Sequence, residues 1–128
     1  LVREAPPSRS NPGRKPGGSA RGRAPVVTVG HVDAAALGWG VQPVRLHGRA
    51  WMRPEVSRSD LAAHALAGPW ATRRLVPKVL VATQTRAIEA WVDAQGVVLP
   101  STPLISVMPR KPVELWHVAA ALMSRLLR

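Results

Sequence analysis

Four consecutive side chains between two apolar runs can all donate hydrogen bonds. They are Thr83, Gln84, Thr85 and Arg86, directly after the run of residues 79–81. The Gln amide and the Arg guanidinium can each make two hydrogen bonds, to an adenine edge and a guanine edge respectively. We therefore take Gln84, Thr85 and Arg86 as candidates for base or near-base contacts.

A second group of candidates consists of basic side chains suited to phosphates. Arg45, His47 and Arg49 alternate with apolar or small residues, so an extended segment would place them on one face, and Arg53 follows shortly after. The residues expected to contact the phosphate backbone of DNA are Arg45, Arg49, Arg53, Lys78, Arg110 and Lys111. The alternative for any single one of them is the solvated outer face of an antiparallel sheet.

Residue sets that carry out catalysis are missing from the sequence. The four histidines lack metal-ligand spacing, and there is no cysteine to join them. No glycine elbow presents a serine, and no carboxylate pair suggests acid–base work. The segment from Asp33 to Gly40 superficially resembles a cofactor loop, but Pro43 replaces the third glycine. We expect no chemistry, no metal and no cofactor in this chain.

Patterns of apolar residues predict the elements that position these candidates. Residues 78–83 are expected to form a strand buried on both faces, because Val79, Leu80 and Val81 make a nearly continuous apolar run, and residues 87–92 alternate like a second strand. Further strands are expected at 26–29, within 41–51 and at 104–108. A helix is expected at 57–67, where Gly68-Pro69 would stop it. A turn at 93–96 should let residues 97–99 pair back on the preceding strand. The expected fold class is α+β, with a small, mostly antiparallel sheet, a short middle helix and a packed C-terminal helix.

The expected C-terminal helix, residues 112–127, is apolar on most of its circumference. One stripe is Val113, Trp116, Ala120, Met123 and Leu127, and a second is Leu115, Val118, Ala119, Leu122 and Leu126. A small sheet can cover only one such face, so we expect this helix to pack also on something outside the chain.

The N-terminal stretch differs in composition from the rest. Residues 1–24 are rich in Pro, Gly, Ser and Arg, which predicts a disordered basic tail before a domain at 25–128. The net charge of +11 favours association with polyanions. The alternatives are basic composition from codon bias and, for the tail, an inert linker or a mistranslated start.

An ordered set of segments resembles a known family. The segments are PKVLVATQTRAIEAWVDAQG (77–96), LPSTPLISVMPR (99–110) and KPVELWHVAAALMS (111–124). They are similar to the C-terminal target-recognition domain of TaqI-like adenine-specific DNA methyltransferases of type II restriction-modification systems. The similarity extends back to Val26, through VVTVGHVD and LGWGVQPVRLHGRAW.

The resemblance implies a function for the parent protein. Such an enzyme transfers a methyl group from S-adenosylmethionine to the exocyclic amine of adenine in double-stranded DNA. Its catalytic domain carries an Asn-Pro-Pro-Tyr-type motif that this chain lacks, so that domain would lie in the same parent protein or another chain. The recognition domain is expected to be incomplete at its C-terminus.

Two alternatives remain open on the sequence. One is a non-catalytic basic adaptor that binds nucleic acid or a protein partner, and the other is a truncated, non-functional gene remnant. The lack of cysteine, of a membrane-spanning apolar run and of a signal peptide favours a cytoplasmic protein without a membrane partner.

Overall fold

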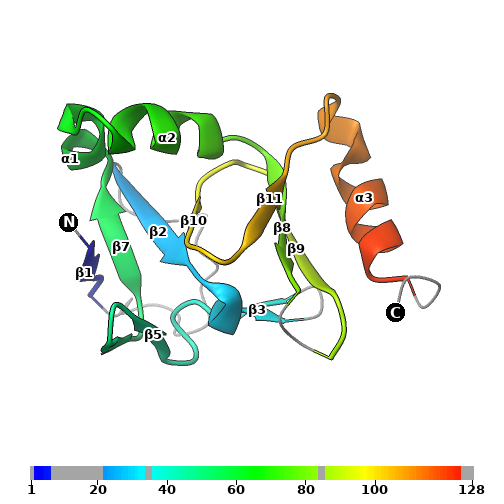
Figure 1. Ribbon diagram of the computed structural model, residues 1–128, viewed down its shortest axis with the longest axis horizontal. Coiled ribbons are helices and arrows are strands. Elements are labelled where there is room, and N and C mark those ends of the chain that lie inside the picture. Colours follow the sequence, from blue (N-terminus) through cyan, green and yellow to red (C-terminus); the bar gives the residue numbers. More distant parts are fainter. Residues whose placement is uncertain (1, 7–21, 34–35, 84–85, 125–128) are drawn as a thin grey trace.

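The computed structural model describes residues 2–6, 22–33, 36–83 and 86–124, and it confirms the α+β class (Figure 1). The strands are β1 (Val2–Glu4), β2 (Arg23–Val27), β3 (Val32–Asp33), β4 (Ala36–Leu37), β5 (Val44–Leu46), β6 (Arg49–Trp51), β7 (Pro54–Ser57), β8 (Lys78–Ala82), β9 (Glu89–Asp93), β10 (Leu99–Pro100) and β11 (Ile105–Val107). The helices are α1 (Arg58–Ala63), α2 (Ala67–Arg74) and α3 (Leu115–Leu122), with short 3₁₀ turns η2 (Val29–His31) and η3 (Pro112–Glu114).

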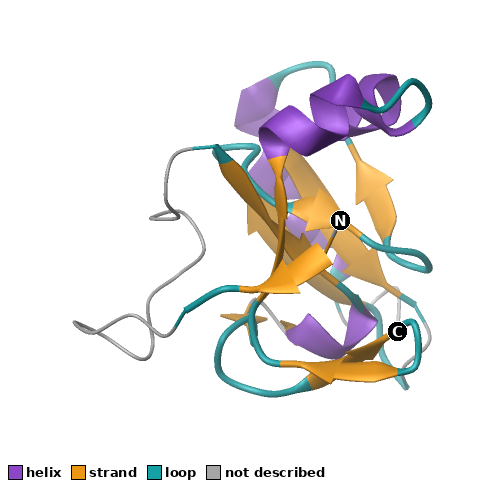
Figure 2. Ribbon diagram, turned by 90° about the vertical axis from the view of Figure 1, so that its left-hand side faces the viewer, coloured by secondary structure: helices purple, strands orange, loops and turns teal. Residues whose placement is uncertain are grey.

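Two larger sheets organise the described residues. One has the order β1-β7-β2-β10, in which only β10 runs parallel to its neighbour, and the other is the antiparallel sheet β11-β8-β9. Figure 2 shows α1 and α2 lying across one end of the strands, whereas α3 packs on the sheet of β8 and β9. The pairs β3–β4 and β5–β6 form two small hairpins.

Strand β8 contributes residues to two apolar clusters, one on each of its faces. Val79 and Val81 face Leu115 and Ala119 of α3, while Leu80 on the opposite face packs among residues of β2, β3 and β10 and their flanks. All five residues of β8 are buried, which confirms the strand expected from its continuous apolar run.

The middle of the chain contains two helices where one was expected. Ser57 caps α1 as expected, but α1 already ends at Ala63. The prediction that Gly68-Pro69 stops the helix was wrong, because these two residues lie in the first turn of α2. Proline is tolerated there because the first N–H groups of a helix have no intrahelical partner. Residues 70–74 are therefore helical rather than a link.

Two more expectations changed on the structure. Residues 97–99 do not pair back on β9, because Leu99 and Pro100 form β10, which pairs in parallel with β2. The C-terminal helix is covered mainly on its second stripe: Leu115 and Ala119 are buried, while Val113 and Trp116 of the first stripe are 74% and 64% exposed. Leu126 and Leu127 lie outside the described residues.

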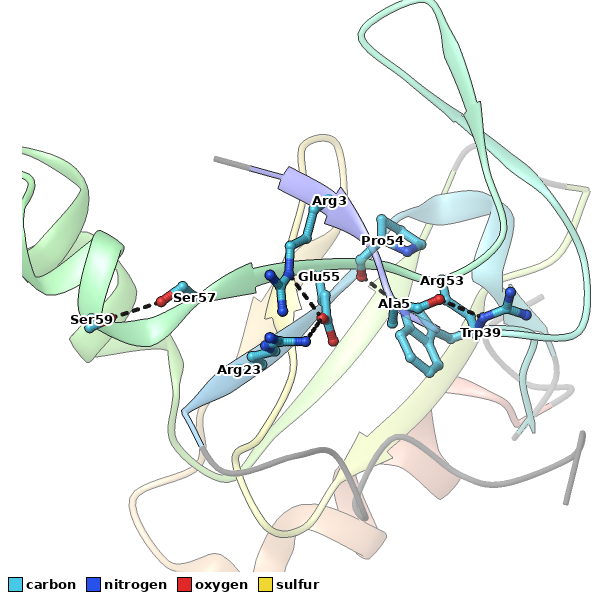
Figure 3. A network of polar contacts seen from close by, with 9 residues as sticks. All are labelled: Arg3, Ala5, Arg23, Trp39, Arg53, Pro54, Glu55, Ser57 and Ser59. Atoms are coloured by element: carbon cyan, nitrogen blue, oxygen red, sulfur yellow. Dashed lines mark hydrogen bonds and ion pairs between the residues drawn. The ribbon is translucent and has the colours of Figure 1, made fainter. Parts of the chain in front are cut away.

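The expected N-terminal tail is ordered at both of its ends. Val2–Glu4 forms β1, and β2 already begins at Arg23, so the described parts of the expected tail include strand residues. Both strands flank β7, and each supplies an arginine to the buried carboxylate of Glu55: Arg3 at 3.3 Å and Arg23 at 2.9 Å (Figure 3). Composition could not predict this strand because its partners lie far away in sequence. Residues 7–21 lie outside the described residues.

A buried ion pair joins the start of β8 to the end of β9. The Lys78 ammonium lies 2.6 Å from Asp93 Oδ2 and donates to the carbonyls of Val98 at 2.8 Å and Val76 at 3.3 Å. Asp93 also accepts hydrogen bonds from the backbone N–H groups of Gly96, Val97 and Val98. Burial lowers the pKa of Lys78, and the Asp93 carboxylate opposes that shift.

Replacement of Asp93 should be the more damaging way to break this pair. Asp93→Ala leaves a buried ammonium and three backbone donors without their carboxylate, so we expect a loss of about 3–5 kcal/mol in the free energy of unfolding. Lys78→Met leaves the carboxylate with its three N–H donors and should cost clearly less. Urea unfolding of both variants measures the difference, and equal losses would contradict this account.

Gly96 and Gly48 offer a matched pair of glycine positions. Both have positive φ, +68° and +76°, but a Cβ on Gly96 would lie 2.4 Å from the backbone carbon of Val76, whereas a Cβ on Gly48 meets nothing within 4 Å. Gly48→Ala should cost about 1 kcal/mol from backbone strain alone. Gly96→Ala should lower the unfolding free energy by at least twice as much, as measured by thermal or urea unfolding.

Candidate nucleic-acid interface

The basic candidates separate into two groups at opposite ends of the strands. In Figure 1 the β5–β6 hairpin and the β8–β9 connection lie at the lower end, whereas α1, α2 and the link from β11 to η3 lie at the upper end. The structure therefore brings Arg45, Arg49, Arg53 and Arg86 to one end and places Arg110 and Lys111 at the other. The antiparallel register of β11 on β8, with Val107 opposite Val79, causes this separation.

The β5–β6 hairpin carries two of the lower-end arginines on different faces. Positive φ at His47 and Gly48 makes a tight turn that folds the segment back on itself. Arg45 lies opposite the exposed Ala50, whereas Arg49 lies opposite the buried Leu46. The expectation that Arg45, His47 and Arg49 share one face was therefore wrong, because it assumed an uninterrupted strand. The expected two-stranded ribbon itself is present.

Arg49 is held by an aromatic ring. Its guanidinium carbon lies 4.2 Å from the centroid of the Trp51 ring, and the indole N–H of Trp51 donates to the carbonyl of Leu46. This cation–π contact fixes the position of the guanidinium without neutralising it. Arg49 is exposed, so its charge remains available to a ligand.

The remaining lower-end candidates differ in how free they are. Arg86 is exposed in the connection after β8, while Gln84 and Thr85 lie outside the described residues. Arg53 is half-buried: its Nε donates to the carbonyl of Ala5 at 3.0 Å (Figure 3), and its backbone N–H donates to the Glu4 carboxylate. The N-terminal segment therefore already uses part of the hydrogen-bonding capacity of Arg53.

Lys78 is not part of any interface, and its assignment as a DNA contact was wrong. Its side chain is 0% exposed, and its ammonium donates hydrogen bonds to Asp93 and to two carbonyls. Its position at the start of an apolar strand gave no sign of burial, because a lysine can also extend along a strand end into water. The partner that buries it is 15 residues away in sequence.

The upper end holds Arg110 and Lys111, exposed in the link between β11 and η3. Helices α1 and α2 add Arg58, Arg73 and Arg74 to this end, and the Arg74 guanidinium lies 4.6 Å from the Trp70 ring centroid. The adjacent pair at 73–74 was visible in the sequence, but only the structure shows that both residues lie in the last turn of helix α2.

Internal contacts use several of the seven carboxylates, which leaves the exposed arginines in excess. Glu55 and Asp93 are buried against cations, and Glu4 accepts from the backbone of Met52 and Arg53. The ion pairs found in the described part of the chain involve only Arg3, Arg23 and Lys78 among the cations. Arg45, Arg86, Arg110 and Lys111 are therefore unneutralised by the residues that the structure describes.

His31 is a buried residue that caps the η2 turn. Its Nδ1 accepts from the Thr28 N–H at 3.1 Å, and the Thr28 hydroxyl oxygen accepts from Gly30 N–H, so the two side chains close the η2 turn. Burial lowers its pKa to about 4. No group of three metal-binding side chains occurs among the described residues.

The segment with a superficial likeness to a cofactor loop folds differently. The described part of residues 33–40 forms the β3–β4 hairpin and a turn, with no helix after it. The indole N–H of Trp39 donates to the Pro54 carbonyl at 2.9 Å, which fastens the turn to β7 (Figure 3). These residues do not offer the strand–loop–helix cradle that a nucleotide-type cofactor needs.

Comparisons of this chain with protein-family models, with curated proteins and with solved structures find no match. Within the described ranges, no helix combines the length and the apolar character needed to cross a membrane.

The depressed pKa of His31 predicts a specific acid sensitivity. The unfolded chain takes up a proton near pH 6.5 while the folded chain resists until about pH 4, so stability falls as the pH drops through this window. Between pH 7 and pH 5 the expected loss is about 2 kcal/mol in the free energy of unfolding. Urea unfolding at both pH values should show this loss for the wild type and for His117→Gln, but not for His31→Gln.

Proposed function

We propose that this chain is the DNA-binding target-recognition module of an S-adenosylmethionine-dependent, adenine-specific DNA methyltransferase of a restriction-modification system. It carries no chemistry itself and works with a methyltransferase catalytic domain, in the same protein or in another chain. The observation that carries the proposal is that two segments at one end of the strands, the β5–β6 hairpin and the β8–β9 connection, carry exposed arginines that the described residues do not neutralise. The segments that resemble the family supply the identity of the parent enzyme.

The lower end is suited to a duplex for geometric reasons. A two-stranded ribbon fits the major groove of B-DNA, and the β5–β6 hairpin presents Arg45 and Arg49 on its two faces. Arg86 adds a third guanidinium from the β8–β9 connection. We assign Arg45 and Arg49 to phosphates and Arg86 to a base edge, together with Gln84 and Thr85, for which the proposal rests on their sequence position.

Two of the upper-end cations, Arg110 and Lys111, fit contacts further along the same duplex. A five-residue strand spans about 13 Å, which equals the rise of about four base pairs. Arg110 and Lys111 therefore lie too far from Arg86 to share its base pair, and we assign them to flanking phosphates. Such contacts fix register and add affinity without reading sequence.

Replacing one arginine from each class tests the assignment. Arg45→Ala should weaken binding about equally on a preferred and a mismatched duplex, and should reduce the slope of log K against log salt by about 0.9. Arg86→Ala should reduce the preference itself by about tenfold, because a base contact is lost. The preferred duplex is first selected from randomised DNA, and fluorescence anisotropy then gives the affinities.

Arg58→Ala, on α1 at the other end, is the matched control for the loss of one positive charge. If Arg45→Ala and Arg86→Ala act alike on both duplexes, the division into phosphate and base contacts is wrong. If the chain selects no sequence at all, the recognition function is wrong.

A protein-binding adaptor is the second candidate, and one observation favours it. Val113 and Trp116 leave large apolar surface on the outer side of η3 and α3. Binding through that surface would depend little on salt, in contrast to binding by guanidinium groups. The salt slope therefore separates the two candidates.

A further inference from the structure

The link between β6 and β7 holds a carboxylate on two successive backbone donors. The N–H of Met52 donates to Glu4 Oε2 at 3.0 Å, and the N–H of Arg53 donates to Glu4 Oε1. Two neighbouring N–H groups that converge on one anion form a concave anion-binding site of the kind that also receives phosphates. Here the anion comes from the chain itself.

The immediate surroundings strengthen this site. The Arg53 side chain extends from the same residue, and its Nε is held by the Ala5 carbonyl. Gly40, with φ +78°, donates its N–H to the Met52 carbonyl at 3.0 Å and lies against the Arg53 side chain. The peptide that points the Arg53 N–H at Glu4 is therefore fixed from behind by the turn after β4.

The site is open to solvent and adjoins the lower-end arginines. Glu4 is exposed, Arg53 is half-buried, and β6 with Arg49 ends one residue before Met52. The strand that supplies Glu4 is anchored separately, because Arg3 pairs with Glu55 and Val2 packs against the core. Glu4 can thus swing away while β1 stays paired to β7.

We propose that the backbone N–H groups of Met52 and Arg53 form a phosphate-binding site that Glu4 occupies as an internal competitor. The ligand is a phosphodiester of the nucleic-acid backbone, so this inference rests on the proposed function. Glu4 blocks the site in the free chain and must leave when a phosphate enters. It thereby lowers the affinity for any duplex, whatever its sequence.

Free phosphate tests the site without DNA. In Glu4→Ala, titration with inorganic phosphate should shift the Met52 and Arg53 amide signals in ¹⁵N–¹H spectra, with saturation. In the wild type and in Glu114→Gln, which removes one negative charge from η3, the same signals should need about tenfold more phosphate, as expected for a competing charged ligand. Absence of a saturable shift at these two amides in Glu4→Ala would overturn the site.

Glu4→Gln controls for the possibility that the substitution at position 4 detaches strand β1. It keeps the length of the side chain and one acceptor oxygen but removes the charge, so its phosphate response should fall between those of the wild type and Glu4→Ala. The amide signals of Val56 and Glu55, which pair with β1, report whether the strand remains in place. A response in Glu4→Ala that appears only when those signals also change would contradict displacement of Glu4 alone.

Duplex binding identifies the source of the phosphate. Glu4→Ala should bind a duplex about fivefold more tightly than Glu114→Gln and steepen the salt slope by about 0.9, the contribution of one added phosphate contact. Equal affinities of these two variants would overturn the inference and leave the proposed function standing. Phosphate shifts without duplex binding by any variant would support the anion site but overturn both the phosphodiester ligand and the proposed function.

Discussion

The buried pair of Lys78 and Asp93 is the constraint on which the rest of the described fold depends. It ties the start of β8 to the end of β9, and through Val98 it also holds the segment that becomes β10. Because β10 pairs with β2, one ion pair links the three-stranded sheet to the four-stranded sheet. An unpaired charge at that depth would be expensive, so the pair also specifies which strand ends must meet.

In the described part of the chain, several carboxylates lie in internal contacts, whereas many guanidinium groups lie on the surface. Glu55 and Asp93 are buried in ion pairs that hold strands together, and Glu4 accepts hydrogen bonds from the backbone. Many arginines instead remain on connections and hairpins at the two ends of the sheets. A chain with only a moderate excess of basic residues in its described part can therefore present surfaces that are strongly positive locally.

The sequence predicted what depends on local pattern and missed what depends on distant partners. The continuous apolar run of β8, the Ser57 cap and the turn at Gly96 are local features, and all three were expected correctly. The parallel pairing of β10, the order of β1 and the burial of Lys78 each depend on a residue that lies more than ten positions away. For the candidate site, residue types were readable, but the face of each arginine was not. One two-residue turn moved Arg49 away from the face of Arg45.

The clasp formed by Arg3, Glu55 and Arg23 has a kinetic consequence. Glu55 is 32 positions from Arg23 and 52 from Arg3, and β1 can pair only with a β7 that has already formed. Closing the longer loop costs more chain entropy and is rewarded by a strand of only three residues. We therefore expect β1 to dock after the folding transition state, so that its contacts slow unfolding and leave the folding rate nearly unchanged.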